Sequence, residues 1–361
     1  MKQERNLLHI ELIRIIAAFW VIFNHTGDRG FFLFSTYDID TVYYWISLFL
    51  SIASKTAVPL FFMITGALLL EKDYSLKTIW LKKIFRIAVV LASFSLFFYI
   101  RKYLMGISSQ LSLKAFIVEL YEGNIKVSFW YLYAYIALLI SLPFLRGLAK
   151  NLTDRMFLYL LGISFLYETI LPCIEFILWE GEVSVNTSVR LTWLLCNIVL
   201  YPITGYYLEY RFDISKIKKQ HVAAMWFLSV TGVLISCFMT CYKQMITGVL
   251  PESLSQEFHN IFMLYLCISV YITIKYLCMK IKVNRSISRL IISAGSCTFG
   301  IYLIHTVILE SRLVSALWYI LADGIHINRI LLPLIICFVV LLIGYMITFI
   351  LKKFPVIKSF I

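Results

Sequence analysis

The chain has 361 residues, of which 61% are apolar and only 15% are charged, and its mean hydropathy is +0.85. This composition excludes an ordinary soluble domain and indicates a protein that crosses the lipid bilayer. The net charge of +13 is spread over the segments between apolar runs. There is no dense basic patch or nucleic-acid-binding motif, so we expect no nucleic-acid partner. The eight cysteines lie almost entirely in apolar runs, which predicts neither a disulfide framework nor a metal site.

The apolar runs have about the length, 17 to 25 residues, that a helix needs to cross the hydrocarbon layer. Helices are the sensible spanning element for such runs, so the sequence predicts an all-α polytopic membrane protein with one domain over residues 1–361. Glu11 and Arg14 interrupt the first run, which is therefore a retained helix rather than a signal peptide. About ten transmembrane helices are predicted, at 8–26, 52–70, 84–100, 127–145, 156–178, 191–208, 222–241, 259–279, 290–309 and 330–351.

Charge in the connecting segments predicts the orientation of the chain. Lys and Arg are concentrated in 72–86, 146–155, 211–219, 280–289 and the tail at 352–358, which the positive-inside rule places in the cytoplasm together with both termini. The acidic loops at 27–41 and 179–190 then face outside. One outer loop is an exception, because it carries four basic residues that two glutamates offset only in part. These residues are Arg101, Lys102, Lys114, Lys126, Glu119 and Glu122.

The first predicted helix contains three ionisable residues, Glu11, Arg14 and His25. A charge near the centre of a membrane helix costs about 2.5 to 3.5 kcal/mol on insertion scales, so such residues indicate a functional site. The eleven-residue step from Arg14 to His25 returns to within about 20° of its starting direction and rises about 16 Å. All three side chains therefore share one stripe, and a single helix is predicted to serve both halves of the bilayer.

Four blocks, in order, carry a resemblance to a known family: Glu11–Ile15 with the run to His25, Val58–Leu69, Ser128–Pro143 and Phe299–His305. Together they resemble the membrane acyltransferase family 3. The resemblance implies about ten transmembrane helices and transfer of an acyl group, usually acetyl, from cytoplasmic acyl-CoA to a hydroxyl of a cell-envelope or exported glycan. It also implies a multi-pass protein of the bacterial inner membrane.

The resemblance carries over to individual residues. Arg14 and His25 match the family's Arg-x10-His pair, and Lys83 and Arg86 fall where many members have an Arg-x-x-Arg pair. Lys83 departs from that pattern and loses the planar guanidinium that grips phosphate bidentately. Two further substitutions, Glu11 for Asp and Thr65 for Ser, preserve the chemistry.

The catalytic candidates are His25, Arg14 and Glu11. His25 is predicted to act as a general base or as the carrier of the acyl group, because the unperturbed pKa of imidazole lies closest to neutrality. Arg14 is expected to hold the acyl-CoA, with Glu11 pairing it at i,i+3. Lys83 and Arg86 are the candidates for the CoA phosphates, although basic residues also occur there simply to orient the chain.

The remaining candidates are predicted to bind the acceptor at the outer face: Lys55, Trp130, Tyr131, Tyr302 and His305. Four of these five residues have a structural alternative. For Lys55 the alternative is a snorkelling residue at the membrane interface. For Trp130 and Tyr131 it is an aromatic belt at that interface, and for His305 it is a hydrogen-bonded core histidine. Two other functional classes also stay open. A transporter would need no acyl-CoA pocket, and a structural partner in a glycan-assembly complex would not need His25.

Overall fold

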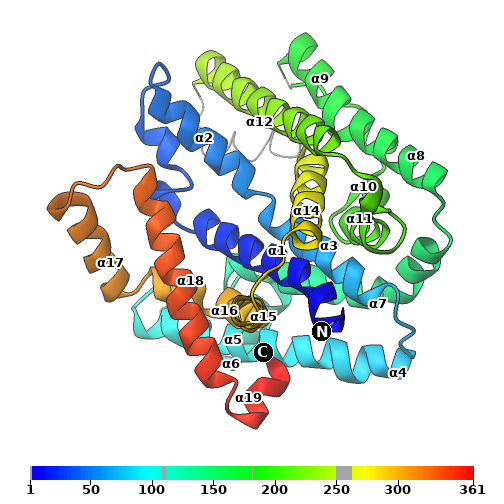
Figure 1. Cartoon of the computed structure of the whole chain (residues 1–361). Coiled ribbons are helices and arrows are strands. Elements are labelled where there is room, and N and C mark those ends of the chain that lie inside the picture. The colour runs from blue at the N-terminus through cyan, green and yellow to red at the C-terminus, as the bar shows by residue number, and fades with distance from the viewer. Residues whose placement is uncertain (1, 108–110, 181, 249–261) are drawn as a thin grey trace.

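A computed structural model describes residues 2–107, 111–180, 182–248 and 262–361, and all regular structure in these residues is helical (Figure 1). This agrees with the all-α prediction. The long helices are α1 (Lys2–Asn24), α2 (Val42–Ser54), α3 (Ala57–Leu69), α5 (Phe85–Leu104), α7 (Trp130–Lys150), α8 (Asp154–Phe165), α11 (Leu200–Tyr210), α12 (Lys219–Thr247), α14 (Met263–Lys280), α15 (Arg285–Ser296), α16 (Thr298–Leu309) and α18 (Leu331–Leu351).

Shorter helices and wide turns join these elements. They are α4 (Leu76–Thr78), α6 (Leu113–Glu122), α9 (Leu171–Trp179), α10 (Thr192–Leu195), α17 (Arg312–Tyr319) and α19 (Pro355–Phe360). Three π-helical turns lie at η3 (Ile79–Ile84), η5 (Leu166–Ile170) and η7 (Ile320–Gly324), and 3-10 turns lie at η1 (Gly27–Arg29), η2 (Leu33–Thr36), η4 (Val127–Phe129) and η6 (Ile214–Lys216).

Seven helical segments of the described chain are long and apolar enough to cross a membrane, and the bent pair α15–α16 makes an eighth if it counts as one span. The seven are Val42–Leu69, Leu76–Leu104, Val127–Lys150, Asp154–Trp179, Lys219–Ile246, Met263–Lys280 and Leu331–Leu351. The prediction of about ten spans is thus supported for seven or eight of them. Part of the predicted span 259–279 lies outside the described residues.

Three predicted spans differ from the structure. The helix predicted at 8–26 forms as part of α1, but α1 is not among the described helices that are apolar enough to cross a membrane. The helix predicted at 52–70 begins earlier, at Val42, and has a break at Lys55 and Thr56 between α2 and α3. The span predicted at 191–208 is wrong as one helix. It contains only α10 and α11, because the chain leaves the helical conformation at Cys196, whose ψ is 154°.

Helix α11 instead packs backbone to backbone against α3. A Cβ at Gly205 would lie 1.9 Å from the Met63 carbonyl oxygen, and a Cβ at Gly66 would lie 1.9 Å from the Pro202 carbonyl oxygen. Each helix therefore presents a glycine at the point where the other helix crosses it. Small residues at helix crossings are the usual means of close packing in membranes. The crossing fixes α3, which lines the cavity described below.

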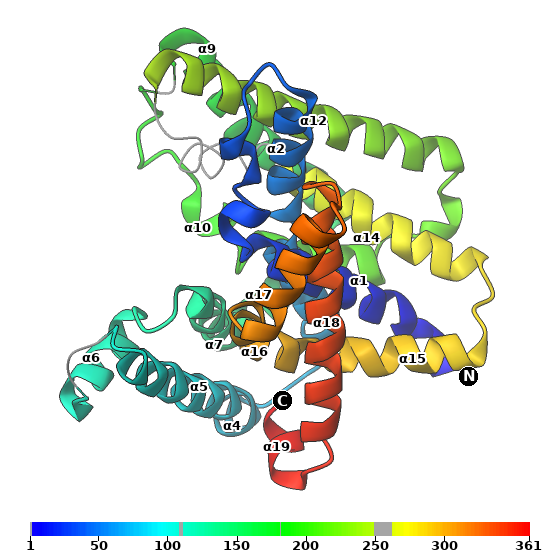
Figure 2. The same cartoon turned by 90° about the vertical axis from the view of Figure 1, so that its left-hand side faces the viewer.

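Helix α1 runs through the middle of the bundle. It packs against α3, α14, α15, α16 and α18, and Figure 2 shows it between α14 and α15. A polar cluster holds one end of it, because Glu209 Oε2 bonds His9 Nε2 at 2.9 Å, the Tyr271 hydroxyl at 2.9 Å and Lys275 Nζ at 3.0 Å. Charge buried among helices needs such partners. The cluster thus anchors the start of α1 to α11 and α14.

Candidate active site

A cavity of about 410 Å³ opens beside the inner part of α1. Four cationic side chains line it, namely Arg14, Lys83, Arg86 and Lys352. The remaining lining is mainly aromatic, aliphatic or small, and is contributed by Phe61, Ile64, Thr65, Leu68, Leu69, Ile87, Tyr131, Tyr135, Gly295, Ser296, Thr298, Phe299, Tyr302 and Ile361. Such a lining suits a long ligand that has an anionic segment for the cations and an apolar segment for the remaining walls.

Arg14 reaches this cavity from α1 with Glu11 as its partner. Arg14 Nη1 donates to Glu11 Oε1 at 2.7 Å, so the predicted i,i+3 pair is confirmed. The second carboxylate oxygen of Glu11 is buried and has no hydrogen-bond partner among the described residues. It occupies the space beside Gly295, where a Cβ would come within 2.3 Å of it. The absence of a side chain at Gly295 therefore makes room for the Glu11–Arg14 pair.

Lys83 and Arg86 enter the cavity from the start of the Leu76–Leu104 span. Lys83 lies in the π-helical turn η3, and Arg86 lies in the first turn of α5. The Lys83 ammonium sits 4.0 Å from the centre of the Tyr74 ring, and Arg86 Nε donates to the Phe360 carbonyl at 3.0 Å. These contacts hold both cations toward the cavity. π-Helical turns frequently occur at functional sites.

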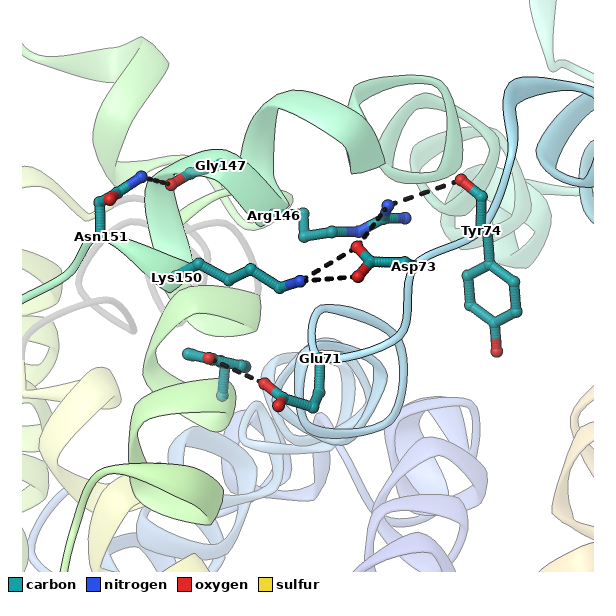
Figure 3. Close-up of polar contacts among 8 residues, drawn as sticks. Glu71, Asp73, Tyr74, Arg146, Gly147, Lys150 and Asn151 are labelled. Carbon is teal, nitrogen blue, oxygen red and sulfur yellow. Dashed lines mark hydrogen bonds and ion pairs between the residues drawn. The ribbon is translucent and has the colours of Figure 1, made fainter.

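The loop before η3 is anchored to the end of α7 (Figure 3). Asp73 accepts from Lys150 Nζ at 3.0 Å on both carboxylate oxygens and pairs with Arg146 Nη1 at 3.3 Å. The hydrogen bond and charge of Lys150 lower the pKa of Asp73 below its usual value. Arg146 also donates to the Tyr74 carbonyl at 3.5 Å. The anchor thereby positions Tyr74, whose ring makes the cation–π contact with the Lys83 ammonium.

The bent pair α15–α16 supplies another wall of the cavity. The two helices meet at 64° around Cys297, and residues on both sides of the bend line the cavity. Lys352 Nζ donates to the Ser296 carbonyl at 2.6 Å and so holds the end of α18 at this bend. The N-terminus of a helix carries partial positive charge, so the start of α16 adds to the cationic character of this wall.

Tyr131 and Tyr302 connect the cavity to two histidines. Their ring centres lie 5.4 Å apart, and the ring of Tyr302 lies 5.9 Å from that of His305. His305 in turn lies 4.8 Å from His25. The Tyr302 hydroxyl also donates to the Ser128 carbonyl. A continuous row of rings therefore runs from the cationic cavity to His25.

The two histidines are held in the same way. His25 Nδ1 lies 2.7 Å from the Val21 carbonyl oxygen, and His305 Nδ1 lies 2.6 Å from the Tyr302 carbonyl oxygen. A carbonyl only accepts, so Nδ1 carries the hydrogen and Nε2 keeps its lone pair in the neutral ring. His305 is buried and its Nε2 has no partner among the described residues, whereas His25 is exposed.

The structure separates the predicted acceptor-binding residues. Tyr131 and Tyr302 line the cationic cavity, whereas Trp130 is 46% exposed and does not line it. Lys55 lies at the level of His25, because the adjacent residues Asn24 and Ser54 are hydrogen-bonded. Its ammonium sits 4.5 Å from the centre of the Phe31 ring.

The basic loop that contradicts the charge pattern proves to be ion-paired. Arg101 Nη1 lies 2.6 Å from Glu310 Oε2, Lys126 Nζ lies 3.2 Å from Glu310 Oε1, and Lys102 lies 3.7 Å from Glu119. Burial alone would raise the pKa of Glu310, but the hydrogen bond from Arg101 and the charge of Lys126 outweigh it and lower that pKa. These pairs reduce the excess positive charge of the loop.

A family model described as an acyltransferase domain matches residues 7–349, nearly the whole chain. The chain belongs to acyltransferase family 3. The matched region contains the candidate spans except for the last two residues of Leu331–Leu351, the cavity except for Lys352 and Ile361, and both His25 and His305. No curated protein and no solved structure matches the chain. Family membership together with the apolar helices indicates a multi-pass membrane enzyme that transfers acyl groups.

One cavity of this acyltransferase brings together three of the residues predicted from the sequence: Arg14, Lys83 and Arg86. Sequence reasoning missed Lys352 there. It counted this residue only among the basic residues of the cytoplasmic tail, because nothing local in the sequence indicates that the end of α18 folds against the α15–α16 bend.

Proposed function

We propose that this acyltransferase moves an acyl group, by default acetyl, from a cytoplasmic acyl-CoA to a hydroxyl of a cell-envelope or exported glycan. The observation that carries the proposal is the cationic cavity, which is joined to His25 through the row of rings Tyr302 and His305. In this proposal both termini are cytoplasmic, the membrane is the bacterial inner membrane, and acyl-CoA is a substrate rather than a resident cofactor.

The donor's phosphates suit the cationic side of the cavity. Charge-assisted hydrogen bonds to phosphate are stronger than hydrogen bonds between neutral groups. The side chains of Lys83, Arg86 and Lys352 can each donate such bonds. Arg14 lies deeper on α1 and is oriented by Glu11, so it is placed to bind the pantetheine arm or polarise the thioester carbonyl. The apolar and aromatic lining suits the uncharged part of the arm.

His25 has the tautomer that the transfer needs. With Nδ1–H donated to Val21, the lone pair on Nε2 is available to take a proton from the acceptor hydroxyl. The acceptor oxygen then attacks the thioester carbonyl, the carbon–sulfur bond breaks, and the leaving thiolate takes the proton from Nε2 of His25. In the carrier form of the mechanism, Nε2 attacks the thioester carbonyl carbon and expels the CoA thiolate, which leaves the acyl group on Nε2. The acceptor oxygen then attacks this acyl carbon, the carbon–nitrogen bond breaks, and the hydroxyl proton passes through His25 to the thiolate.

The acceptor is proposed to approach His25 from the exposed side, with Lys55 and Trp130 at the rim and His305 below it. The buried lone pair of His305 Nε2 is available for an N–H or O–H hydrogen of a bound substrate. Tyr131 and Tyr302, which line the cavity, are then assigned to the donor side of the site.

The test uses the full chain in proteoliposomes with radiolabelled acetyl-CoA on the side of the cationic cavity. We expect label in glycan with wild type and its loss, by at least about 100-fold, in His25→Ala. His221→Ala, an exposed histidine at the start of α12, is the matched control and should keep the wild-type rate. Undiminished labelling by His25→Ala would refute its role. Label retained on protein without acceptor would identify the carrier form.

A further inference from the structure

His25 lies beside a lysine, Lys55, that forms no ion pair with a carboxylate of the described residues. Two hydrogen bonds between Asn24 and Ser54, of 3.3 and 2.5 Å, tie the end of α1 to the end of α2 and bring Lys55 next to His25. The Lys55 ammonium contacts the Phe31 ring and forms no ion pair within the part of the chain that the structure describes. It lies close enough to act electrostatically on His25.

A second source of positive charge acts on His25 from the end of α16. Glu310, directly after this helix, pairs with both Arg101 and Lys126. One carboxylate therefore faces two cations. Lys126 also lies over the Phe98 ring at 5.1 Å and acts electrostatically on both His25 and His305.

The surroundings of His25 thus hold three cations, Lys55, Arg101 and Lys126, and one carboxylate, Glu310, which gives a net charge of +2. An ammonium held among helices without a counter-ion costs free energy, and the chain keeps it beside an exposed histidine. Clustered charge of one sign raises the local concentration of oppositely charged ligands. The positive charge therefore favours an anion at the position where the acceptor must bind.

We infer that the acceptor is anionic, with a carboxylate or phosphate near the reacting hydroxyl that binds Lys55 and Lys126 while the hydroxyl faces His25. This inference rests on the proposed acyl transfer and adds the chemical class of the acceptor. The anionic group has two possible sources. One is a uronic acid within the glycan, and the other is the diphosphate of a lipid carrier.

The first experiment compares three acceptors with the full chain in proteoliposomes supplied with labelled acetyl-CoA. They are a uronic-acid oligosaccharide, the same oligosaccharide with its carboxyls reduced, and that neutral oligosaccharide on a polyprenyl diphosphate. We expect KM to be about tenfold lower for an anionic acceptor than for the neutral one, with the difference shrinking at high salt. A preference for the first acceptor identifies uronate, and a preference for the third identifies the lipid diphosphate.

Variants then locate the effect. Lys55→Gln and Lys126→Gln should each raise KM for the preferred anionic acceptor about tenfold and leave KM for the neutral one unchanged. Lys114→Gln, a control on α6, should change neither. Two separate lysines are tested so that a folding defect in one variant does not decide the outcome, and size-exclusion profiles monitor folding.

Three results would overturn the inference. Equal KM values for all three acceptors in wild type would show that charge is not recognised. If Lys55→Gln and Lys126→Gln instead lowered kcat equally for charged and neutral acceptors, the two lysines would be assigned to stabilising the oxyanion of the transition state. If acetyl-CoA binds but no acceptor is labelled, the proposed function fails and the inference fails with it, whereas the first two results leave acyl transfer intact.

Discussion

Substitution of Gly205 by alanine tests whether the α3–α11 crossing determines the shape of the donor cavity. The added Cβ would lie 1.9 Å from the Met63 carbonyl oxygen, whereas a carbon–oxygen contact needs about 3.3 Å. The obstacle is backbone, so no side-chain rotation relieves it and the helices must separate by more than about 1 Å. A gap of about 0.5–1 Å already forfeits a quarter to a half of the dispersion energy between facing atoms.

Both helices are buried over most of their length, so we expect Gly205→Ala to lower the free energy of unfolding by about 3 kcal/mol. Because α3 carries Phe61 and Thr65 of the cavity, KM for acyl-CoA should also rise. Unfolding by SDS in mixed micelles measures the first effect. Gly162→Ala on α8, with nothing within 4 Å of its Cβ, should be neutral or slightly stabilising. Equal stability of the two variants would refute the close crossing.

Three further predictions concern the donor cavity and its supports. Lys83→Gln should weaken acyl-CoA binding about tenfold in a calorimetric titration, whereas Lys82→Gln, its exposed neighbour outside the cavity, should not. Gly295→Ala should displace the Glu11 carboxylate and lower kcat/KM, and the shorter Glu11→Asp in the same chain should restore part of it. The pKa of Asp73 is lowered in the folded protein, so its stabilising contribution is present at neutral pH and is lost as pH falls below the ordinary carboxyl value of about 4. The difference in unfolding temperature between wild type and Asp73→Asn should therefore be constant from pH 8 to about 5 and shrink at lower pH; a difference that grows on acidification would contradict the assignment.

The sequence was sufficient for the membrane class, for most spans and for the residues of the first helix. Those features depend on local composition and on helical period, and α1 is continuous from Lys2 to Asn24, so the Arg14-to-His25 spacing applies. The prediction failed at 191–208, where an apolar run of spanning length folds as two separate helices, α10 and α11. Hydropathy cannot distinguish a span from a buried helix, and Gly205 is exposed to neither lipid nor water but packs against α3.

The site was predictable only in part, for a similar reason. Arg14, Lys83 and Arg86 lie on elements whose polarity is visible in the sequence. The contribution of Lys352 depends instead on the bend at Cys297. Arg101 and Lys126 are brought together by Glu310, which is more than 180 residues away from both in the sequence. The π-helical turn at 79–84 also shifts the direction of the following residues relative to an ideal α-helix. Long-range packing of this kind leaves no local pattern.

The geometry of α1 bears on how the acyl group reaches His25. Eleven residues separate Arg14 from His25, a rise of about 16 Å in a continuous helix. Arg14 and His25 are therefore separated along α1, and the rings of Tyr302 and His305 connect the cationic cavity to His25. In the proposed function, a thioester whose phosphates bind Lys83 and Arg86 must extend along this row for its carbonyl to meet His25. An extended, flexible arm such as pantetheine meets that requirement, and a short acyl phosphate does not. Acetyl-CoA should therefore label the acceptor, whereas acetyl phosphate, which carries the same acyl group, should not.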